Sequence, residues 1–233
     1  MTLSTELKEL LISNGATEIG FAKLEDTDMI HGNLPNAVSI LIKFPSKIIN
    51  TLLEDYPTKI YIDTLLEIND ILDKLVLLGE NFLKQQGYQA YGQTKERTIV
   101  EEDKRSKIPY KTVATRAGLG WIGKCALLIH PKYGSAVRLA SIYTDAPLDI
   151  GEPIIQSYCG DCDECVKFCP GNACTGVDWN INIDRNLIYN QKKCGDKALA
   201  LSIEKTGVDH YYCGKCIIVC PFTKKYLKEE LRK

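Results

Sequence analysis

Two runs of cysteines constrain this 233-residue chain more than any other feature of its sequence. The runs are Cys159-x2-Cys162-x2-Cys165-x3-Cys169 followed by Pro170, and Cys213-x2-Cys216-x3-Cys220 followed by Pro221. The first spacing is the bacterial ferredoxin signature, in which three close thiolates bind one iron–sulfur cluster and the fourth, which precedes a proline, binds the other. The sequence therefore predicts two [4Fe–4S] clusters.

The same rule assigns thiolates to each cluster, because the fourth cysteine of each run is expected to bind the opposite cluster. The first set is then Cys159, Cys162, Cys165 and Cys220. The second set is Cys169, Cys213, Cys216 and one more thiolate, from either Cys194 or Cys174. We favour Cys194, because Cys174 is only five residues past Cys169 whereas Cys194 lies on the segment leading into the second run.

Zinc sites and disulfide bonds fit these runs less well. Zinc takes four ligands per ion, which three thiolates at two-residue spacing before a Cys-Pro pair match poorly. A disulfide framework needs an oxidising compartment, and residues 1–11 show no basic-then-apolar signal segment. We therefore expect a cytoplasmic protein in which Cys125 and Cys174 are buried structural thiols.

Composition excludes several partners. Hydrophobic residues make up 45% and charged residues 25%, as in ordinary soluble domains, and no apolar run is long enough to span a bilayer. The net charge of −1 provides no overall basic field for nucleic acid. The basic residues from Lys224 to Lys233 are interrupted by Glu229 and Glu230, which predicts a solvated terminal helix. We expect neither a membrane nor a nucleic acid as partner.

Hydrophobic periodicity divides the chain into two parts. Helices are predicted at 5–13 and 60–86, and strands at 18–22, 37–44, 88–91, 125–130 and 137–143. The mixed-charge stretch 94–106 predicts an exposed segment, and the proline, glycine and acidic residues at 147–153 predict a linker. We therefore expect an α/β domain at residues 1–150 that binds a cofactor or substrate, followed by a two-cluster domain at 151–233.

A glycine-rich segment lies at residues 111–124. Its glycines Gly118, Gly120 and Gly123 permit close backbone approach to a bulky ligand, and Arg116 and Lys124 supply donors. The segment is neither a Walker A motif nor a dinucleotide fingerprint, because no strand clearly leads into it and no acidic residue stands at the ribose position. Taken alone, such glycines more often mark a packed turn than a cofactor site.

Three features in this order resemble the epoxyqueuosine reductases and their shorter relatives, faintly before residue 111 and strongly after it. They are the strings Ala114-Thr-Arg-Ala-Gly-Leu-Gly-Trp-Ile-Gly-Lys124 and Tyr143-Thr-Asp-Ala-Pro-Leu148 and the two cysteine runs. The resemblance implies an α+β protein with a nitroreductase-like and cobalamin-processing-like N-terminal domain, which holds base-off cobalamin, and a ferredoxin-like domain that reduces it. It also implies Cys194 as the eighth cluster ligand. The implied cofactor-binding residues are Arg116, Gly118, Leu119, Gly120, Trp121, Gly123 and Lys124.

The sequence departs from the family's pattern at two positions. By rough alignment Gln93 stands where the family's reductases carry an aspartate proposed as proton donor, and a glutamine cannot donate a proton by ionising. Cys125 stands where the long reductases keep a histidine after Gly-Lys. Glu101, Glu102 and Asp103 are candidate replacements for the missing acid, although a solvated acidic loop is the simpler account of them.

The resemblance implies an iron–sulfur oxidoreductase whose clusters pass low-potential electrons to a cofactor of the N-terminal domain, with cobalamin one candidate. The epoxyqueuosine reductases continue into helical repeats that help bind tRNA, whereas this sequence ends thirteen residues after Cys220, so we do not expect a tRNA substrate. Shortened segments around the expected pocket leave open an electron-transfer protein that reduces a separate enzyme or corrinoid protein. Either function needs an electron donor such as a ferredoxin or flavodoxin. A third alternative, in which the clusters are structural, is the one we favour least.

Overall fold

The computed structural model describes residues 2–24, 34–98, 106 and 108–232, so the candidate acids Glu101, Glu102 and Asp103 lie outside the described residues. The chain contains both helices and strands and forms two compact units, each assembled from segments that are distant in sequence. The first unit comprises Met1–Ile42, Ile68–Leu119 and Arg138–Ile154, and the second comprises Lys43–Glu67, Gly120–Val137 and Ile155–Lys233. The division at residue 150 stays a prediction, since these units follow other segments.

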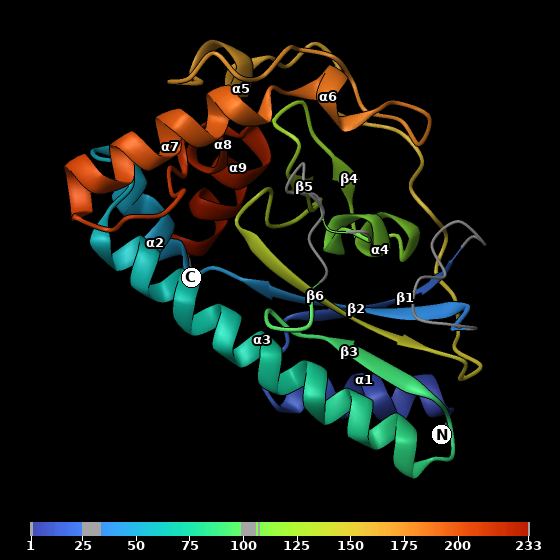
Figure 1. The fold of residues 1–233 in the computed structure, drawn as a ribbon. Coiled ribbons are helices and arrows are strands. Elements are labelled where there is room, and N and C mark those ends of the chain that lie inside the picture. The colour runs from blue at the N-terminus through green and yellow to red at the C-terminus, as the bar shows by residue number, and fades with distance from the viewer. Residues whose placement is uncertain (1, 25–33, 99–105, 107, 233) are drawn as a thin grey trace. The chain divides into compact units, whose positions relative to one another are not determined.

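A four-stranded sheet forms the centre of the first unit, in the order β1-β2-β6-β3 (Figure 1). Its strands are β1 (Glu18–Lys23), β2 (Asn36–Lys43), β3 (Ala90–Gln93) and β6 (Val137–Thr144). Strand β1 pairs antiparallel with β2, and β3 pairs antiparallel with β6. Strand β2 is buried from Asn36 to Ile42, as its unbroken apolar run predicts for a strand covered on both faces.

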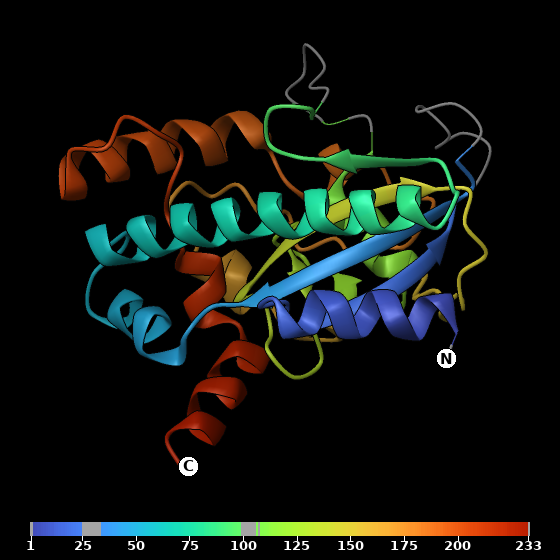
Figure 2. The ribbon, with the colours of Figure 1, turned by 90° about the horizontal axis from the view of Figure 1, so that it is seen from below.

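Helices cover both faces of this sheet. Helix α1 (Leu3–Ser13) and the part of α3 (Lys59–Gln85) that belongs to the first unit lie on one face, and α4 (Tyr110–Arg116) lies over the other (Figures 1 and 2). The α3–β6 contact is close, because a Cβ added at Gly79 would lie 2.5 Å from Cδ1 of Ile142. On the opposite face a Cβ at Gly20 would lie 2.9 Å from that of Ala117.

Of the seven helices and strands predicted from hydrophobic periodicity, six are confirmed, with boundaries within two residues. The predicted strand at 125–130 is too long: β5 covers only Leu128–Ile129, His130 forms an isolated bridge to Gly134, and the residues before β5 form a turn. Helix α4 was not predicted. The predicted linker at 147–153 also packs within the first unit, where Gly151 N donates to Phe21 O at 2.9 Å and Ile154 N donates to Thr115 O at 2.9 Å.

Glu80 is a buried carboxylate on α3, with only 5% of its surface exposed. Its Oε2 accepts hydrogen bonds from the backbone N–H of Gly92 at 3.1 Å and from Arg97 Nη1 at 2.7 Å, while Lys84 donates to Oε1. Burial alone would raise the pKa of Glu80, but these donors together hold it below its usual value. The carboxylate therefore joins α3, β3 and the segment that follows β3.

The second unit is made mostly of short helices. They are α2 (Ser46–Asn50), the 3-10 helix η2 (Thr51–Leu53), α5 (Glu164–Lys167), α6 (Arg185–Ile188), α7 (Gln191–Thr206), α8 (Lys215–Val219) and α9 (Pro221–Glu230). Helix α7 is capped at its N-terminus by Asn190, whose side chain accepts from Lys193 N, and at its C-terminus by left-handed Gly207. None of the helices in the described part of the chain combines the length and apolarity needed to cross a membrane.

Segments from the N-terminal half help to hold α8 and α9 in the second unit. Helix α2 contacts both α8 and α9. Tyr226 donates its hydroxyl proton to Phe44 O at 2.8 Å, and a Cβ added at Gly134 would lie 2.2 Å from Thr223 N. The predicted terminal helix is therefore confirmed as α9, but its Tyr226 and Leu227 are buried rather than solvated.

Candidate iron–sulfur site

A small β-hairpin approaches the first cysteine run within the second unit. Strands β4 (Trp121–Ile122) and β5 pair antiparallel, and the tip between them carries Lys124 and Cys125. The tip is closed by hydrogen bonds from Ala126 N to Gly123 O at 2.8 Å and from Gly123 N to Leu127 O at 2.9 Å. Ala126 has a φ of 59°, in the left-handed region that non-glycine residues seldom occupy. A tight turn thus positions Cys125.

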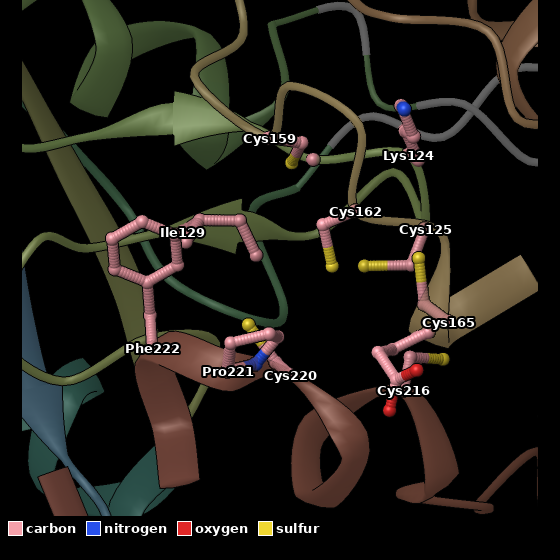
Figure 3. Close-up of a pocket in the computed structure, with 12 residues that line it drawn as sticks. Lys124, Cys125, Ile129, Cys159, Cys162, Cys165, Cys216, Cys220, Pro221 and Phe222 are labelled. Carbon is pink, nitrogen blue, oxygen red and sulfur yellow. The ribbon is translucent and has the colours of Figure 1, made fainter. Parts of the chain in front are cut away.

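The four thiols predicted to bind the first cluster line one pocket. These are Cys159, Cys162, Cys165 and Cys220, and Cys125 and Cys216 line the same pocket (Figure 3). A turn closed by the hydrogen bond from Cys162 N to Cys159 O at 3.1 Å starts the run, and Cys165 lies on α5. Cys220 comes from the second run, at the extended junction between α8 and α9 that Pro221 fixes. Four thiolates around one pocket fit a [4Fe–4S] cluster.

The candidate ligands line a pocket and do not converge on the position of a single metal ion. In the described part of the chain, no three His, Cys, Asp or Glu side chains lie close enough to hold a single metal ion. A cubane spreads its thiolates over four irons, whereas a zinc site converges four ligands on one ion. The arrangement therefore has the donor chemistry that a cluster requires.

The candidate thiols of the second cluster form a second group, Cys169, Cys194, Cys213 and Cys216. Burial raises the pKa of Cys213 to about 12, and the neighbouring Cys216, Cys194 and Cys169 contribute to the same shift. Burial likewise raises the pKa of Cys194 to about 11, with Cys216 and Cys169 again contributing. Iron binding must therefore displace protons from these two thiols.

Cys174 lies near both groups but contacts the first. Its thiol hydrogen-bonds to Cys165, and that contact is the main reason why the pKa of Cys174 is raised. Cys194 lies on the first turn of α7 and interacts with three members of the second group. This difference favours Cys194 as the fourth ligand of the second cluster. Cys174 is half-buried, so the prediction that it is a buried thiol is wrong.

Hydrogen bonds from neighbouring thiols stabilise two of the candidate ligands as thiolates. Donation by Cys125 and then by Cys174 lowers the pKa of Cys165 to about 3. Donation by Cys125 also lowers the pKa of Cys216. The pKa of Cys125 itself is raised by these contacts and by its burial. Cys125 is therefore the protonated partner of one thiol from each group.

Lys124 is held by the loop of the first run. Its side chain is buried, and Nζ donates to Gly160 O at 2.7 Å and lies 3.7 Å from Asp178 Oδ2. Figure 3 shows the amine directed away from the labelled cysteines. The ammonium group therefore fixes the turn between Cys159 and Cys162.

The glycines predicted to approach a cofactor face protein atoms. In the first unit, Gly118 has a φ of 75°, and an added Cβ would lie 2.6 Å from Glu152 O. In the second unit, a Cβ at Gly120 would lie 2.3 Å from Ile129 O, and one at Gly123 would lie 2.8 Å from Ile129 Cγ1. Packing accounts for the lack of a Cβ at all three positions.

The remaining predicted cofactor residues are divided between the units. In the first unit, Leu119 packs near Gly20 and Arg116 ends α4. In the second unit, Trp121 is buried and makes edge-on contacts with Tyr158 and Phe222, at centroid distances of 5.3 and 4.9 Å. Tyr158 precedes Cys159 in sequence, and Phe222 lines the pocket that contains Cys159 and Cys220. The cofactor role of all seven residues stays a prediction.

Gln93 is enclosed in the first unit, with 3% of its surface exposed. Tyr143 donates its hydroxyl proton to Gln93 Oε1, and Gln93 Nε2 donates to Ile108 O at 3.5 Å. Tyr110 donates to the backbone O of Gln93 at 3.1 Å. Burial raises the pKa of Tyr143. The side-chain amide at this position therefore organises a buried polar network.

Comparison with known proteins identifies the cluster segment. Residues 158–223 match the protein family described as "4Fe-4S double cluster binding domain". This segment covers both cysteine runs and Cys194. The match supports iron–sulfur clusters in this segment.

Relatives of the chain are named epoxyqueuosine reductases. The one from Lactococcus garvieae is 38% identical over 112 residues, which are 48% of this chain and 31% of the relative. An epoxyqueuosine reductase structure solved with a tRNA stem loop has a TM-score of 0.66 at 22% identity, and covers 95% of this chain and 65% of that one. The predicted resemblance to epoxyqueuosine reductases is confirmed.

Reductive dehalogenases share the fold. One structure, described in connection with B12-dependent dehalogenation, has a TM-score of 0.72 at 18% identity and covers 97% of this chain and 33% of that one. The match to the Lactococcus garvieae relative spans about a third of the length of that protein. The similarity to these structures therefore shows the fold of this chain and does not identify its substrate.

Proposed function

We propose that this protein is an iron–sulfur oxidoreductase in which two [4Fe–4S] clusters deliver low-potential electrons to a cofactor bound by its N-terminal residues. The observation that carries the proposal is the pocket in which Cys220 of the second run joins Cys159, Cys162 and Cys165 of the first. That exchange of the fourth ligand belongs to paired clusters that relay electrons. The clusters supply one-electron transfer.

The residues of the chain perform the remaining tasks. Lys124 fixes the loop of the first run through Gly160 O, and Phe222, which lines the pocket, limits the access of water to its thiols. A donor of the ferredoxin or flavodoxin class loses one electron for each electron that a cluster gains. The acceptor gains the same electron, and no covalent bond forms or breaks in this relay.

Cobalamin is the acceptor that we propose to test first, because a B12-dependent dehalogenase shares the fold. Anaerobically prepared protein should contain about eight irons per chain, four for each cluster. Addition of cobalamin should give about one cobalt per chain and the visible spectrum of the base-off form. About eight irons with no cobalt uptake would reject cobalamin, and protein without iron would reject the cluster assignment itself.

A second function is an electron carrier that reduces a separate enzyme or corrinoid protein. It is favoured by the three glycines, which face protein atoms, and by Lys124, whose amine is already engaged. Reduced protein would then transfer electrons to an added corrinoid protein while binding no cobalamin of its own. Failure to reduce that protein, with cobalamin bound instead, would exclude this alternative.

A further inference from the structure

The first unit contains a cavity of its own, lined by residues of α3, α4, β6 and the segment that follows β3. Its volume is about 250 Å³. Sites for drug-sized ligands occupy about 300–1,000 Å³, so this cavity suits a smaller molecule. Leu72, Leu139 and Ala140 form its apolar part, and the rest of its lining is polar or charged. An apolar wall with a few polar groups is typical of a small-molecule site.

Arg138 is held in this lining by a neutral partner. Its Nε and Nη2 atoms both donate to Oδ1 of Asn69 on α3, at 3.1 and 2.9 Å. In the described part of the chain, no carboxylate forms an ion pair with Arg138. A guanidinium group has five N–H donors, and the amide oxygen of Asn69 accepts from only one edge of it. The other edge, which includes Nη1, therefore keeps its donors, and the positive charge is not neutralised.

Two hydroxyl groups of the same lining offer acceptors. Thr98 Oγ1 donates to Thr94 O at 2.8 Å, and Tyr110 Oη donates to Gln93 O at 3.1 Å. The two hydroxyl oxygens also lie 2.8 Å apart. Each hydroxyl has a single proton, so both protons are used within the protein. The oxygen lone pairs are what these two groups can offer to a ligand.

Asp73 and Lys95 contribute charges of opposite sign to the cavity. Oδ1 of Asp73 accepts from the backbone N–H of Lys95 at 2.9 Å, which leaves Oδ2 for another donor. The Lys95 amine lies 3.8 Å from Oδ1 of Asp70 in an exposed pair, and such pairs contribute little. Because Asp73 and Lys95 offset each other, Arg138 gives the lining a net positive charge.

We propose that this cavity binds a small hydroxylated organic anion, whose carboxylate or phosphate group accepts from Arg138 and whose hydroxyl groups donate to Asp73 and the two hydroxyl oxygens. The planar donor fork of arginine matches the oxygen atoms of both kinds of anion. A guanidinium group already oriented by Asn69 loses little freedom when the ligand binds. The site goes beyond the electron relay and does not depend on bound iron.

Isothermal titration calorimetry of the full chain tests the site. The anionic probes are glycerate and glycerol 3-phosphate, and glycerol is the control that carries hydroxyl groups without the charge. At least one anion should bind with one-to-one stoichiometry, and glycerol should not. Tighter binding of glycerate would assign the site to carboxylates, and tighter binding of glycerol 3-phosphate would assign it to phosphates. Binding of neither anion, or equal binding of glycerol, would overturn the proposal.

Asn69→Asp is the most specific variant, because it keeps the size of the side chain and its contact with Arg138 but neutralises the guanidinium charge. It should weaken anion binding by about tenfold or more, as expected when a charge-assisted hydrogen bond is lost. Arg138→Gln should have an effect at least as large. Lys74→Gln is the matched control, since Lys74 is an exposed residue next to Asp73 that does not line the cavity. Its affinity should stay within about twofold of the wild type, because exposed charges are screened by salt.

Two results with these variants would overturn the assignment. One is wild-type affinity in Asn69→Asp, and the other is an equal loss in Lys74→Gln, which would show a diffuse effect of charge. Asn69→Asp adds an ion pair to an existing contact, so it provides the test even if Arg138→Gln does not fold. Far-ultraviolet circular dichroism checks the fold of each variant.

Discussion

The two units acquire a stable interior in different ways. The first unit encloses an apolar sheet between helices, and its buried polar groups, such as Glu80 and Gln93, are hydrogen-bonded by the chain itself. The second unit contains every large apolar side chain of the described part of the chain that is at least half exposed. These are Leu53, Ile60, Ile155, Tyr158, Phe168, Ile181, Leu187 and Leu231.

This difference indicates what holds the second unit together. Apolar groups left in water contribute little to folding, and short helices of four or five residues are not stable by themselves. In the proposed function, iron would cross-link eight thiols from distant segments. Metal-binding free energy would then contribute to the folding free energy of the second unit, whereas side-chain packing stabilises the first.

Iron removal should give the largest difference between the units. After anaerobic chelation, amide hydrogens of α7 and α8 should lose their protection from exchange, whereas those of β2 and β6 should keep it. Hydrogen exchange read by mass spectrometry measures both in one experiment. Equal loss in both units would contradict the comparison, as would full protection of α7 and α8 in the iron-free protein.

Single replacements of Cys194 and Cys174 should differ in their effect on the iron content. Cys194→Ser should lose most of one cluster, or about four of eight irons, because Cys194 completes the second ligand set. Cys174→Ser should retain both clusters, because its thiol is a hydrogen-bond donor to Cys165 rather than a ligand. Iron analysis with visible spectra measures the effect. The reverse result, with iron lost only in Cys174→Ser, would show that Cys174 is the eighth ligand.

Gly120→Ala should destabilise the second unit through the hairpin. The new Cβ would lie 2.3 Å from Ile129 O, a backbone atom that cannot move aside cheaply. Overpacking of this kind costs about 1–3 kcal/mol. Thermal unfolding monitored by the cluster absorbance measures the change.

Gly195→Ala is the matched control in α7. Its Cβ would meet only ring atoms of Tyr211, at 3.6 Å or more. Alanine inside a helix is favoured over glycine by about 0.5–1 kcal/mol, so a small stabilisation is expected. If the two variants had equal stabilities, the close backbone approach at Gly120 would carry no strain.

Glu80→Gln should have an effect confined to the first unit. The variant keeps the size of the side chain but loses the charge that accepts from Arg97 and Gly92, at a cost of about 1–3 kcal/mol. Urea unfolding followed by far-ultraviolet circular dichroism measures this, and the iron content should stay unchanged. Glu67→Gln, an exposed position on α3, should alter stability by less than about 0.5 kcal/mol.

The advantage of wild-type Glu80 over glutamine should depend on pH. Because the folded-state pKa of Glu80 lies below its usual value, the ionised carboxylate stabilises the fold above the ordinary carboxylate range. That contribution should be lost as the pH falls through the lowered, folded-state pKa of Glu80, so the two proteins should converge in acid below that pKa. A difference that stays constant from neutral pH to acid would assign the effect to shape rather than charge.

Local patterns predicted most elements of the first unit. Helix α3 and strand β2 have long, regular apolar spacing, which specifies both type and extent. The sequence did not reveal the hairpin, because the residues from Cys125 to Ile129 are all apolar and indicate a strand. A left-handed Ala126 and a turn hydrogen bond decide that conformation, and neither has a clear sequence signal.

Ligand spacing predicted the site better than periodicity predicted its surroundings. Cys159, Cys162, Cys165 and Cys220 share a pocket as expected. The position of Cys125 could not be derived, because it depends on segments 120–137 and 155–233 packing in one unit. The only sequence feature that pointed to Cys125 was its position directly after Gly123-Lys124.

The second unit is assembled from distant segments of the chain, and its C-terminal segment depends on contacts with the earlier ones. Residues 155–233 carry the eight proposed ligands, yet Tyr226 uses the carbonyl of Phe44, and Thr223 packs against Gly134. Recombination that transferred only the C-terminal segment would leave both partners and Cys125 behind. A fragment restricted to residues 155–233 would therefore lack contacts that hold α9 in place in the whole chain.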